Sequence, residues 1–140
     1  MIKIRIVSKS GNIPSYETKG SAGCDLKAAI DAPVMLFPLD RVYINTKVSI
    51  DLPEGYEAQV RGRSGLNRNH GLVVPVGTID ADYRGEIGVI IYNLSRDVYT
   101  IFPGDRIAQL VISPCIQANW EEVESLNTTG RNGGFGSTGK

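Results

Sequence analysis

The residues best suited to chemistry lie in the segment Gly77–Glu86. Between its two ends this segment contains two carboxylates, a phenol and a guanidinium within a few positions. Asp80 could activate a water molecule as a general base, and Tyr83 could form an aromatic wall against a ligand. The glycines would let the backbone approach that ligand closely, because they have no Cβ. A solvated polar turn would explain this segment equally well in isolation, so its chemistry has to be weighed with other clusters.

Three further clusters would suit a phosphorylated ligand. Arg63, Ser64 and Gly65 offer a guanidinium, a hydroxyl and backbone amides at a possible helix N-terminus, where anions are favoured. Asp25 follows a glycine at the start of an expected strand, and its carboxylate would suit Mg²⁺, directly or through water. Gln109 lies among apolar neighbours, where an amide could orient a phosphate or a water. Each cluster is a weak signal alone, since Gln109 could equally serve a strand edge.

The segment 127–140 is rich in Gly, Ser, Thr and Asn and is too polar to fold alone. Within it, Gly134–Lys140 nearly matches a Walker-type phosphate loop, but no strand and helix flank it. Composition alone favours a disordered end. However, Arg131 and Phe135 could let this tail close over a ligand that is both phosphorylated and planar.

Length, charge and cysteine content restrict the function further. The 140 residues suffice for one domain with a buried core. Lys plus Arg and Asp plus Glu both total 15, whereas a protein that binds nucleic-acid backbones would be basic. Cys24 and Cys115 show no metal-site spacing and make no disulfide framework, so we expect buried free thiols in a reducing compartment. No apolar run reaches membrane-spanning length, and we predict a soluble, cytoplasmic protein.

The elements that must position these residues are expected to be strands. Apolar and polar residues alternate over 2–6 and again over 42–52, which predicts two half-buried strands, the second one long. Further strands are expected at 56–60, 86–92, 97–102 and 106–113, and only 64–69 resembles a helical turn. Many short strands with Gly and Pro between them indicate an all-β jelly roll or barrel. We expect this domain to cover residues 1–126, followed by the flexible segment 127–140.

Taken in order, the five clusters resemble the motifs of the trimeric dUTP diphosphatases (dUTPases). The matching segments are Ala22–Leu26, Gly62–Leu66, Gly77–Glu86, Gly104–Leu110 and Arg131–Gly139. The resemblance extends over residues 21–139, which is nearly the whole chain. There are two departures from the family pattern: Gly62 stands where the family often has Pro, and Val74 stands where some members carry Asn.

The resemblance implies a dUTPase-like jelly-roll or distorted β-barrel subunit and a homotrimer whose subunits share their active sites. It implies hydrolysis of dUTP to dUMP and pyrophosphate with Mg²⁺, which keeps uracil out of DNA and supplies dUMP for thymidylate synthesis. Asp80 would be the general base for the water that attacks the α-phosphorus, and Asp25 would position the waters of the metal. Tyr83 would pack against C2′ of the sugar and exclude a ribose hydroxyl.

The remaining site residues follow from the same resemblance. A tight hairpin over residues 74–79 would read the uracil edge mainly through backbone groups and exclude a 5-methyl. Its substrate-binding residues would be Val74, Gly77, Thr78 and Ile79. The phosphate oxygens would be held by Arg63, Ser64, Gly65 and Gln109. The closing lid would contain Arg131, Phe135, Gly136, Ser137 and Thr138. Asp82 and His70 are expected to be structural.

Two alternative functions remain open at this point. A dCTP deaminase shares the fold and part of the motifs, but it needs a carboxylate in the pocket, and the segment Gly88–Asn93 offers no acid. A non-catalytic relative that senses nucleotides could have lost Asp80 or Ser64, and both are present. No nucleic-acid or membrane partner is expected in either case.

Overall fold

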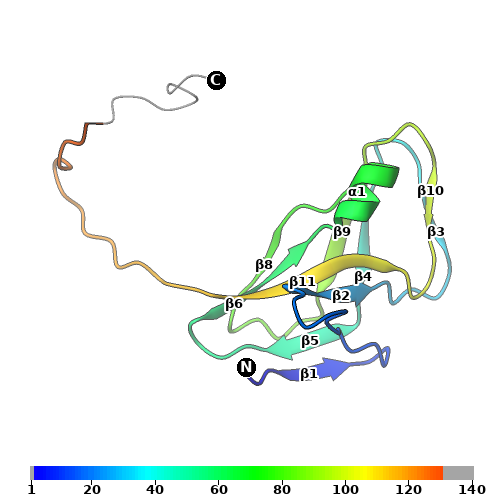
Figure 1. The fold of residues 1–140 in the computed structure, drawn as a ribbon, viewed down its shortest axis with the longest axis horizontal. Helices are drawn as coiled ribbons and strands as arrows, with labels where there is room; N and C mark the ends of the chain where they lie inside the picture. The colour runs from blue at the N-terminus through cyan, green and yellow to red at the C-terminus, as the bar shows by residue number, and fades with distance from the viewer. Residues whose placement is uncertain (1, 131–140) are drawn as a thin grey trace.

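Nearly all regular structure in the described part of this protein is β-strand. The computed structural model describes residues 2–130 and contains one short helix, α1 (Ser64–His70) (Figure 1). The strands are β1 (Arg5–Ser8), β2 (Gly23–Lys27), β3 (Val34–Leu36), β4 (Arg41–Asn45), β5 (Val48–Asp51), β6 (Tyr56–Arg61), β7 (Leu72–Val73), β8 (Gly77–Ile79), β9 (Gly88–Asn93), β10 (Tyr99–Ile101) and β11 (Arg106–Pro114). The predicted all-β class of jelly-roll type is confirmed.

The strands form four antiparallel sheets. The largest has the order β2-β11-β6-β8, and a second has the order β4-β9-β7. Two ribbons, β1-β5 and β10-β3, complete the body. The long strand β11 lies inside the largest sheet, where Gln109 is paired with Asp25 of β2 on one side and with Arg61 of β6 on the other.

The core joins these sheets through the inward residues of each strand. Leu26 and Val60 come from the largest sheet, Ile44 and Ile91 come from the second, and Ile101 comes from the β10-β3 ribbon. All five are at most 3% exposed. Burying such a side chain contributes about 1.5–3 kcal/mol, so this shared core holds the sheets together.

The single long strand expected over 42–52 is wrong, because the chain forms two strands in different sheets. It changes direction at Thr46 and Lys47, and Lys47 adopts a left-handed backbone conformation with φ of 55°. The Thr46 hydroxyl donates a hydrogen bond to the carbonyl of Ile87 at 2.7 Å, and the side-chain oxygen of Asn45 accepts one from the amide of Lys47 at 2.7 Å. The buried alternation continues through this corner, which is why the pattern resembled one strand.

Other sequence-based boundaries were adjusted by the structure. The first strand begins at Arg5 rather than at residue 2, and the short strands β3, β7 and β8 carried too few residues for periodicity to reveal. The helical turn was correctly predicted and extends to His70, where Gly71 with φ of 64° ends it. Cys24 is buried as expected, but Cys115 is exposed, because it follows the last residue of β11.

Residues 115–130 contain no helix or strand and lead away from the body as an extended arm, coloured orange to red in Figure 1. Ile116, Trp120 and Leu126 on this arm are at least 85% exposed. The domain boundary near residue 126 remains a prediction. Within residues 2–130, no helix has the length and apolar character needed to cross a membrane.

Candidate active site

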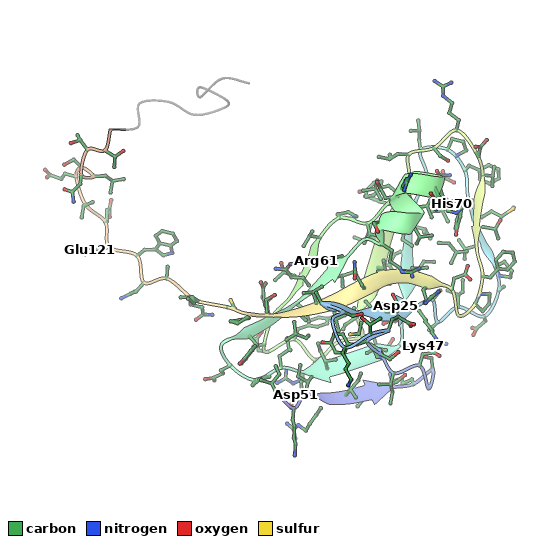
Figure 2. The ribbon with its side chains drawn as sticks, viewed as in Figure 1. Asp25, Lys47, Asp51, Arg61, His70 and Glu121 are labelled. Carbon is green, nitrogen blue, oxygen red and sulfur yellow. The ribbon has the colours of Figure 1, made fainter. Side chains whose placement is uncertain are left out.

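One group of predicted residues meets at the edge where β2, β11 and the start of α1 come together. The register of β2 and β11 places Asp25 opposite Gln109, and the chain leaves β6 through Gly62 to reach Arg63. Figure 2 shows Asp25 beside β11 in the middle of the body. Pairing of strands distant in sequence therefore joins three of the predicted motifs.

The carboxylate of Asp25 is held between two guanidinium groups. Its Oδ1 lies 3.2 Å from Nε of Arg63, and its Oδ2 lies 3.4 Å from Arg106. Arg63 also donates to the backbone carbonyl of Arg106 at 3.2 Å, and Arg106 lies 3.5 Å from Glu17. Arg63 is thus oriented by its neighbours, and its side chain remains 30% exposed, so the guanidinium can still meet an anionic ligand.

The amide of Gln109 is also fixed in orientation. Its Nε2 donates to the carbonyl of Gly62 at 3.1 Å. A Cβ at Gly23 would lie 2.6 Å from Oε1 of Gln109, so only glycine leaves room for this side chain on β2. One N–H of the Gln109 amide is left over by this bond, because the Nε2 group carries two hydrogens.

These residues line a cavity of about 420 Å³, which we call the phosphate-side cavity. Its wall includes all five residues predicted for phosphate or metal: Asp25, Arg63, Ser64, Gly65 and Gln109. It also includes Glu17 and His70, which the sequence did not assign to the site. Glu17 lies in a loop where periodicity offers no signal. His70 packs on Tyr99 with ring centroids 5.0 Å apart, in keeping with the structural role expected for it.

Few side chains in the described residues could bind Mg²⁺ directly. Within residues 2–130, no group of three or more His, Cys, Asp or Glu side chains gathers as a metal cage. Asp25 supplies one carboxylate, and both of its oxygens face guanidinium groups. Mg²⁺ is commonly held by one or two carboxylates, waters and substrate phosphates, and this donor set fits that mode of binding with Asp25 acting through water.

Asp80 lies in a different part of the chain, on the turn that follows β8. The amide of Tyr83 donates to the carbonyl of Asp80 at 3.1 Å and closes this turn. Asp80 and Thr78 line a second cavity of about 730 Å³, the acid-side cavity, together with Glu57, Asp82 and Cys115 among others. The Asp80 residue is exposed, so its carboxylate is accessible to water and ligands.

The turn carrying Asp80 and Tyr83 is anchored to the β1-β5 ribbon and to β4. Arg84 lies 2.5 Å from Asp51 of β5, and Glu86 lies 2.7 Å from Lys9. Asn45 donates to Glu86 at 2.6 Å. The hydrogen bonds from Lys9 and Asn45 lower the pKa of Glu86 below its ordinary value. These contacts limit the freedom of the loop before any ligand arrives.

Tyr83 folds back over its own loop. Its hydroxyl donates to the carbonyl of Glu86 at 3.1 Å, and a Cβ at Gly85 would overlap the phenol. The glycine therefore permits one specific position of the ring. The sequence places Gly85 two residues after Tyr83, but this spacing alone does not show that the ring packs on the glycine.

The segment expected to read a base is not a paired hairpin as predicted. Strand β7 pairs with β9, and β8 pairs with β6, so the two strands belong to different sheets and do not pair with each other. Val74 passes next to Gly62 on its way to β8. Gly77, Thr78 and Ile79 form an edge strand, and one side of their backbone is left without a strand partner in residues 2–130.

The phosphate-side and acid-side cavities have no lining residue in common. The structure thus brings Asp25, Arg63, Ser64, Gly65 and Gln109 together and places Asp80 and Thr78 elsewhere. The predicted lid residues Arg131, Phe135, Gly136, Ser137 and Thr138 lie outside the described residues.

Comparisons with known proteins agree on one family. The dUTPase family model matches residues 9–139. The chain is 48% identical to the deoxyuridine 5′-triphosphate nucleotidohydrolase of Anaplasma marginale, covering 99% of both chains. It is 49% identical to the enzyme of the same name from Finegoldia magna, again with 99% of both chains covered.

Solved structures agree with these sequence matches. A Staphylococcus bacteriophage 80alpha dUTPase solved with dUpNHpp superimposes with a TM-score of 0.89 and 29% identity, covering 99% of both chains. A mutant dUTPase from the S. aureus phage phi11, described with a structural Mg(II) ion, gives a TM-score of 0.81 and 28% identity over 89% of this chain and 98% of its own.

Proposed function

Because this chain belongs to the dUTPase family and hydrolyses dUTP, we propose that it releases dUMP and pyrophosphate at sites that the subunits of a homotrimer share. The observation that carries this proposal is the separation of the two cavities within one chain. Groups that can hold phosphate lie in one cavity, and the acid suited to activate water lies in the other. A second copy can supply the missing half.

In this reading, the triphosphate lies in the phosphate-side cavity of one subunit. Arg63 neutralises phosphate charge, while the Ser64 hydroxyl and the free N–H of Gln109 donate to phosphate oxygens. Asp25 holds the Arg63 guanidinium in place through their 3.2 Å contact. Positioning and charge neutralisation are the main requirements of phosphoryl chemistry, and these residues supply both.

The chemical step follows from placing Asp80 of a neighbouring subunit beside the α-phosphorus. Its carboxylate accepts a proton from the attacking water as the water oxygen bonds to the α-phosphorus. The bond from that phosphorus to the oxygen bridging to the β-phosphorus breaks, and pyrophosphate leaves. Mg²⁺, when bound to the triphosphate, would supply additional charge neutralisation, with Asp25 orienting its waters.

The open edge of β8 supports backbone recognition of uracil. Gly77, Thr78 and Ile79 pair with β6 on one side only. The backbone N–H and C=O groups on the other side can meet the donor and acceptor groups of a uracil edge. Tyr83, held over Gly85, then lies on the same loop as Asp80 and is proposed to pack on C2′ of the sugar.

The arm supports delivery of the lid to another subunit. Residues 115–130 lead away from the body, and they end directly before the predicted lid residue Arg131 (Figure 1). The body carries an apolar groove of about 500 Å³ whose wall includes Ile2, Ile6 and Ile112. We propose that apolar side chains on the arm of one copy, such as Ile116 and Trp120, pack into this groove of another, and that the arm carries its lid to the shared site.

The test is pyrophosphate release from dUTP, dCTP and UTP with Mg²⁺ present. We expect rapid release from dUTP and very little from the other two. Deamination of dCTP would favour the deaminase alternative, and binding of all nucleotides without release would favour a non-catalytic sensor.

A further inference from the structure

The ribbon formed by β3 and β10 is apolar on both of its faces. On the inner face, Leu36 and Ile101 are at most 1% exposed. Met35 is paired with Thr100, and side chains of the same parity point outward. On this outer face, Met35 is 60% exposed and Phe37, Val98 and Phe102 are each at least 50% exposed. A strand that is apolar on both faces is typical of one that is covered on both faces.

The turn after β3 adds a fifth exposed apolar side chain, that of Leu39, whose backbone conformation is strained. Pro38 and Leu39 occupy its central positions, and Leu39 has a φ of 69°. The amide of Asp40 donates to the carbonyl of Phe37 at 3.0 Å, and the Asp40 carboxylate accepts from the amide of Phe37 at 2.8 Å. This is the arrangement of a type II turn, in which glycine is preferred at the position of Leu39.

Packing within the subunit does little to offset this strain at Leu39. Leu39 is 80% exposed, and a left-handed conformation costs a residue with a Cβ on the order of 1 kcal/mol. Strained backbone conformations cluster at functional contacts, so the one at Leu39 motivates a functional hypothesis for this turn. The outer-face residues and Leu39 are called here the ribbon patch: Met35, Phe37, Leu39, Val98 and Phe102.

The size of the ribbon patch suits a protein interface. Five large side chains that are half exposed or more present roughly 500 Å² of apolar surface, which is near the upper end for a monomer. With a polar rim, this approaches the about 800 Å² that each partner contributes to a standard interface. Both ribbon strands also have one open edge in the described residues, and an open edge can pair with another chain.

The charges at the rim favour a second copy of the same chain. Arg96 and Asp97 are exposed neighbours beside Val98, and Asp40 and Arg41 are exposed neighbours beside Leu39. Adjacent charges of both signs allow each cation to face an anion when a patch meets its own copy across a two-fold axis. An anionic membrane surface would instead favour an excess of Lys and Arg.

We propose that the ribbon patch is an interface between two copies of this chain, packed face to face, that associates assembled enzymes beyond the trimer. The ribbon lies at the end of the body opposite to the arm (Figure 1). The proposed contact between two ribbon patches therefore does not involve the arm. The inference rests on the homotrimer of the proposed function, but not on the catalytic roles assigned above.

The chain offers a matched pair of variants for the test. Leu39→Gly removes the exposed side chain and the strain together, whereas Lys47→Gly removes a left-handed strain at φ of 55° away from the patch. In both variants the relief of strain is offset by the greater freedom of glycine in the unfolded chain, so both should unfold near the wild-type temperature and neither is expected to fail by misfolding. Phe37→Glu is a third variant, which places a charge on the outer face.

Sedimentation velocity over a wide concentration range gives the result. Wild type and Lys47→Gly should show a species heavier than the trimer that grows with concentration. Leu39→Gly should require about tenfold more protein to reach the same fraction, equivalent to about 1.4 kcal/mol, and Phe37→Glu more still.

Three outcomes overturn the proposal. Wild type could remain a trimer at every concentration. The two glycine variants could associate equally well. The trimer of Phe37→Glu could dissociate into single chains and lose dUTP hydrolysis, which would place the ribbon patch at the subunit interface of the trimer.

Discussion

The phenol of Tyr83 rests over Gly85, with its hydroxyl bonded to the carbonyl of Glu86 at 3.1 Å. A methyl group at Gly85 would occupy the same space as the ring, so Gly85→Ala should displace Tyr83 without altering any other side chain of the site. We expect the ratio of kcat/KM for dUTP over UTP to fall about tenfold, equivalent to about 1.4 kcal/mol of lost discrimination.

Two further variants separate this effect from general damage. Gly20→Ala is the matched control, since a Cβ there meets nothing within 4 Å. In a Tyr83→Ala background, Gly85→Ala should have no further effect on the ratio. If Tyr83→Ala alone leaves the ratio unchanged, sugar selection depends on other groups, most directly the backbone of β8.

Asp80→Asn tests the proposed base. The amide keeps the shape of the carboxylate but cannot accept the proton from water, so kcat should fall by roughly 10²–10⁴. Binding of dUpNHpp, measured by calorimetry, should be largely retained, because the phosphate contacts lie in the other cavity. Retention of more than about a tenth of wild-type kcat would contradict the assignment.

Deletion of residues 130–140 tests the lid. It removes Arg131, Phe135, Ser137 and Thr138 and no residue of the buried core. Two lost charge-assisted hydrogen bonds of about 1.5–3 kcal/mol each should lower kcat/KM by about 10² or more. The unfolding temperature should hardly change. Full activity of the truncated protein would show that the tail has no role in turnover.

Mixing these two inactive proteins tests whether the subunits share sites. In a mixed trimer whose sites are built from different subunits, a site is active only when two conditions hold. The subunit that supplies Asp80 must be a truncated chain, and the subunit that supplies the lid must be an Asp80→Asn chain. Random reassembly at equal amounts satisfies both conditions in about a quarter of sites, so that share of activity should return. Sites built within one chain would regain nothing, provided that light scattering confirms mixed trimers.

The depressed pKa of Glu86 predicts a pH-dependent contribution to stability. Because the hydrogen bonds from Lys9 and Asn45 favour the ionised form, the contribution is fully present above the ordinary pKa of 4.5 and is lost as the pH falls through the lower value in the folded protein. Glu86→Gln should therefore lower the unfolding temperature at pH 7, and this difference should shrink below about pH 4.5. Glu121→Gln on the exposed arm is the control, and it should change neither value (Figure 2).

The residues predicted to hold phosphate lie together in the structure, while their roles toward a ligand remain predictions. Asp25, Arg63, Ser64 and Gln109 were singled out by residue type and motif, and the pairing of β2 with β11 contributes to bringing them together. The corner at Lys47 was missed because the alternation of buried and exposed residues runs through it unchanged. A lysine also does not indicate a left-handed backbone conformation, as a glycine would. Periodicity reports which face a residue takes, but it does not report which sheet a strand joins.

Other features depend on contacts that a linear pattern does not encode. The separation of Asp80 from Arg63 follows from the antiparallel pairing of β8 with β6. Gly77 lies opposite Val60 and Ile79 lies opposite Ala58, so the chain runs back toward the start of β6 before it reaches Asp80. The exposure of Cys115 follows from where β11 ends. The apolar outer face of the β3-β10 ribbon was hidden, because β3 is too short for its alternation to stand out.

If the open edge of β8 reads the base as proposed, this has a consequence for how base selectivity can change over evolution. A recognition surface made of main-chain groups is the same whatever side chains Thr78 and Ile79 carry, so substitutions there should leave the choice of base intact. Selectivity would change only when the path of the backbone changes, through an insertion, a deletion or a proline that removes an amide. Base selectivity that depends on the main chain is therefore retained through most point mutations, and the surrounding side chains are free to diverge.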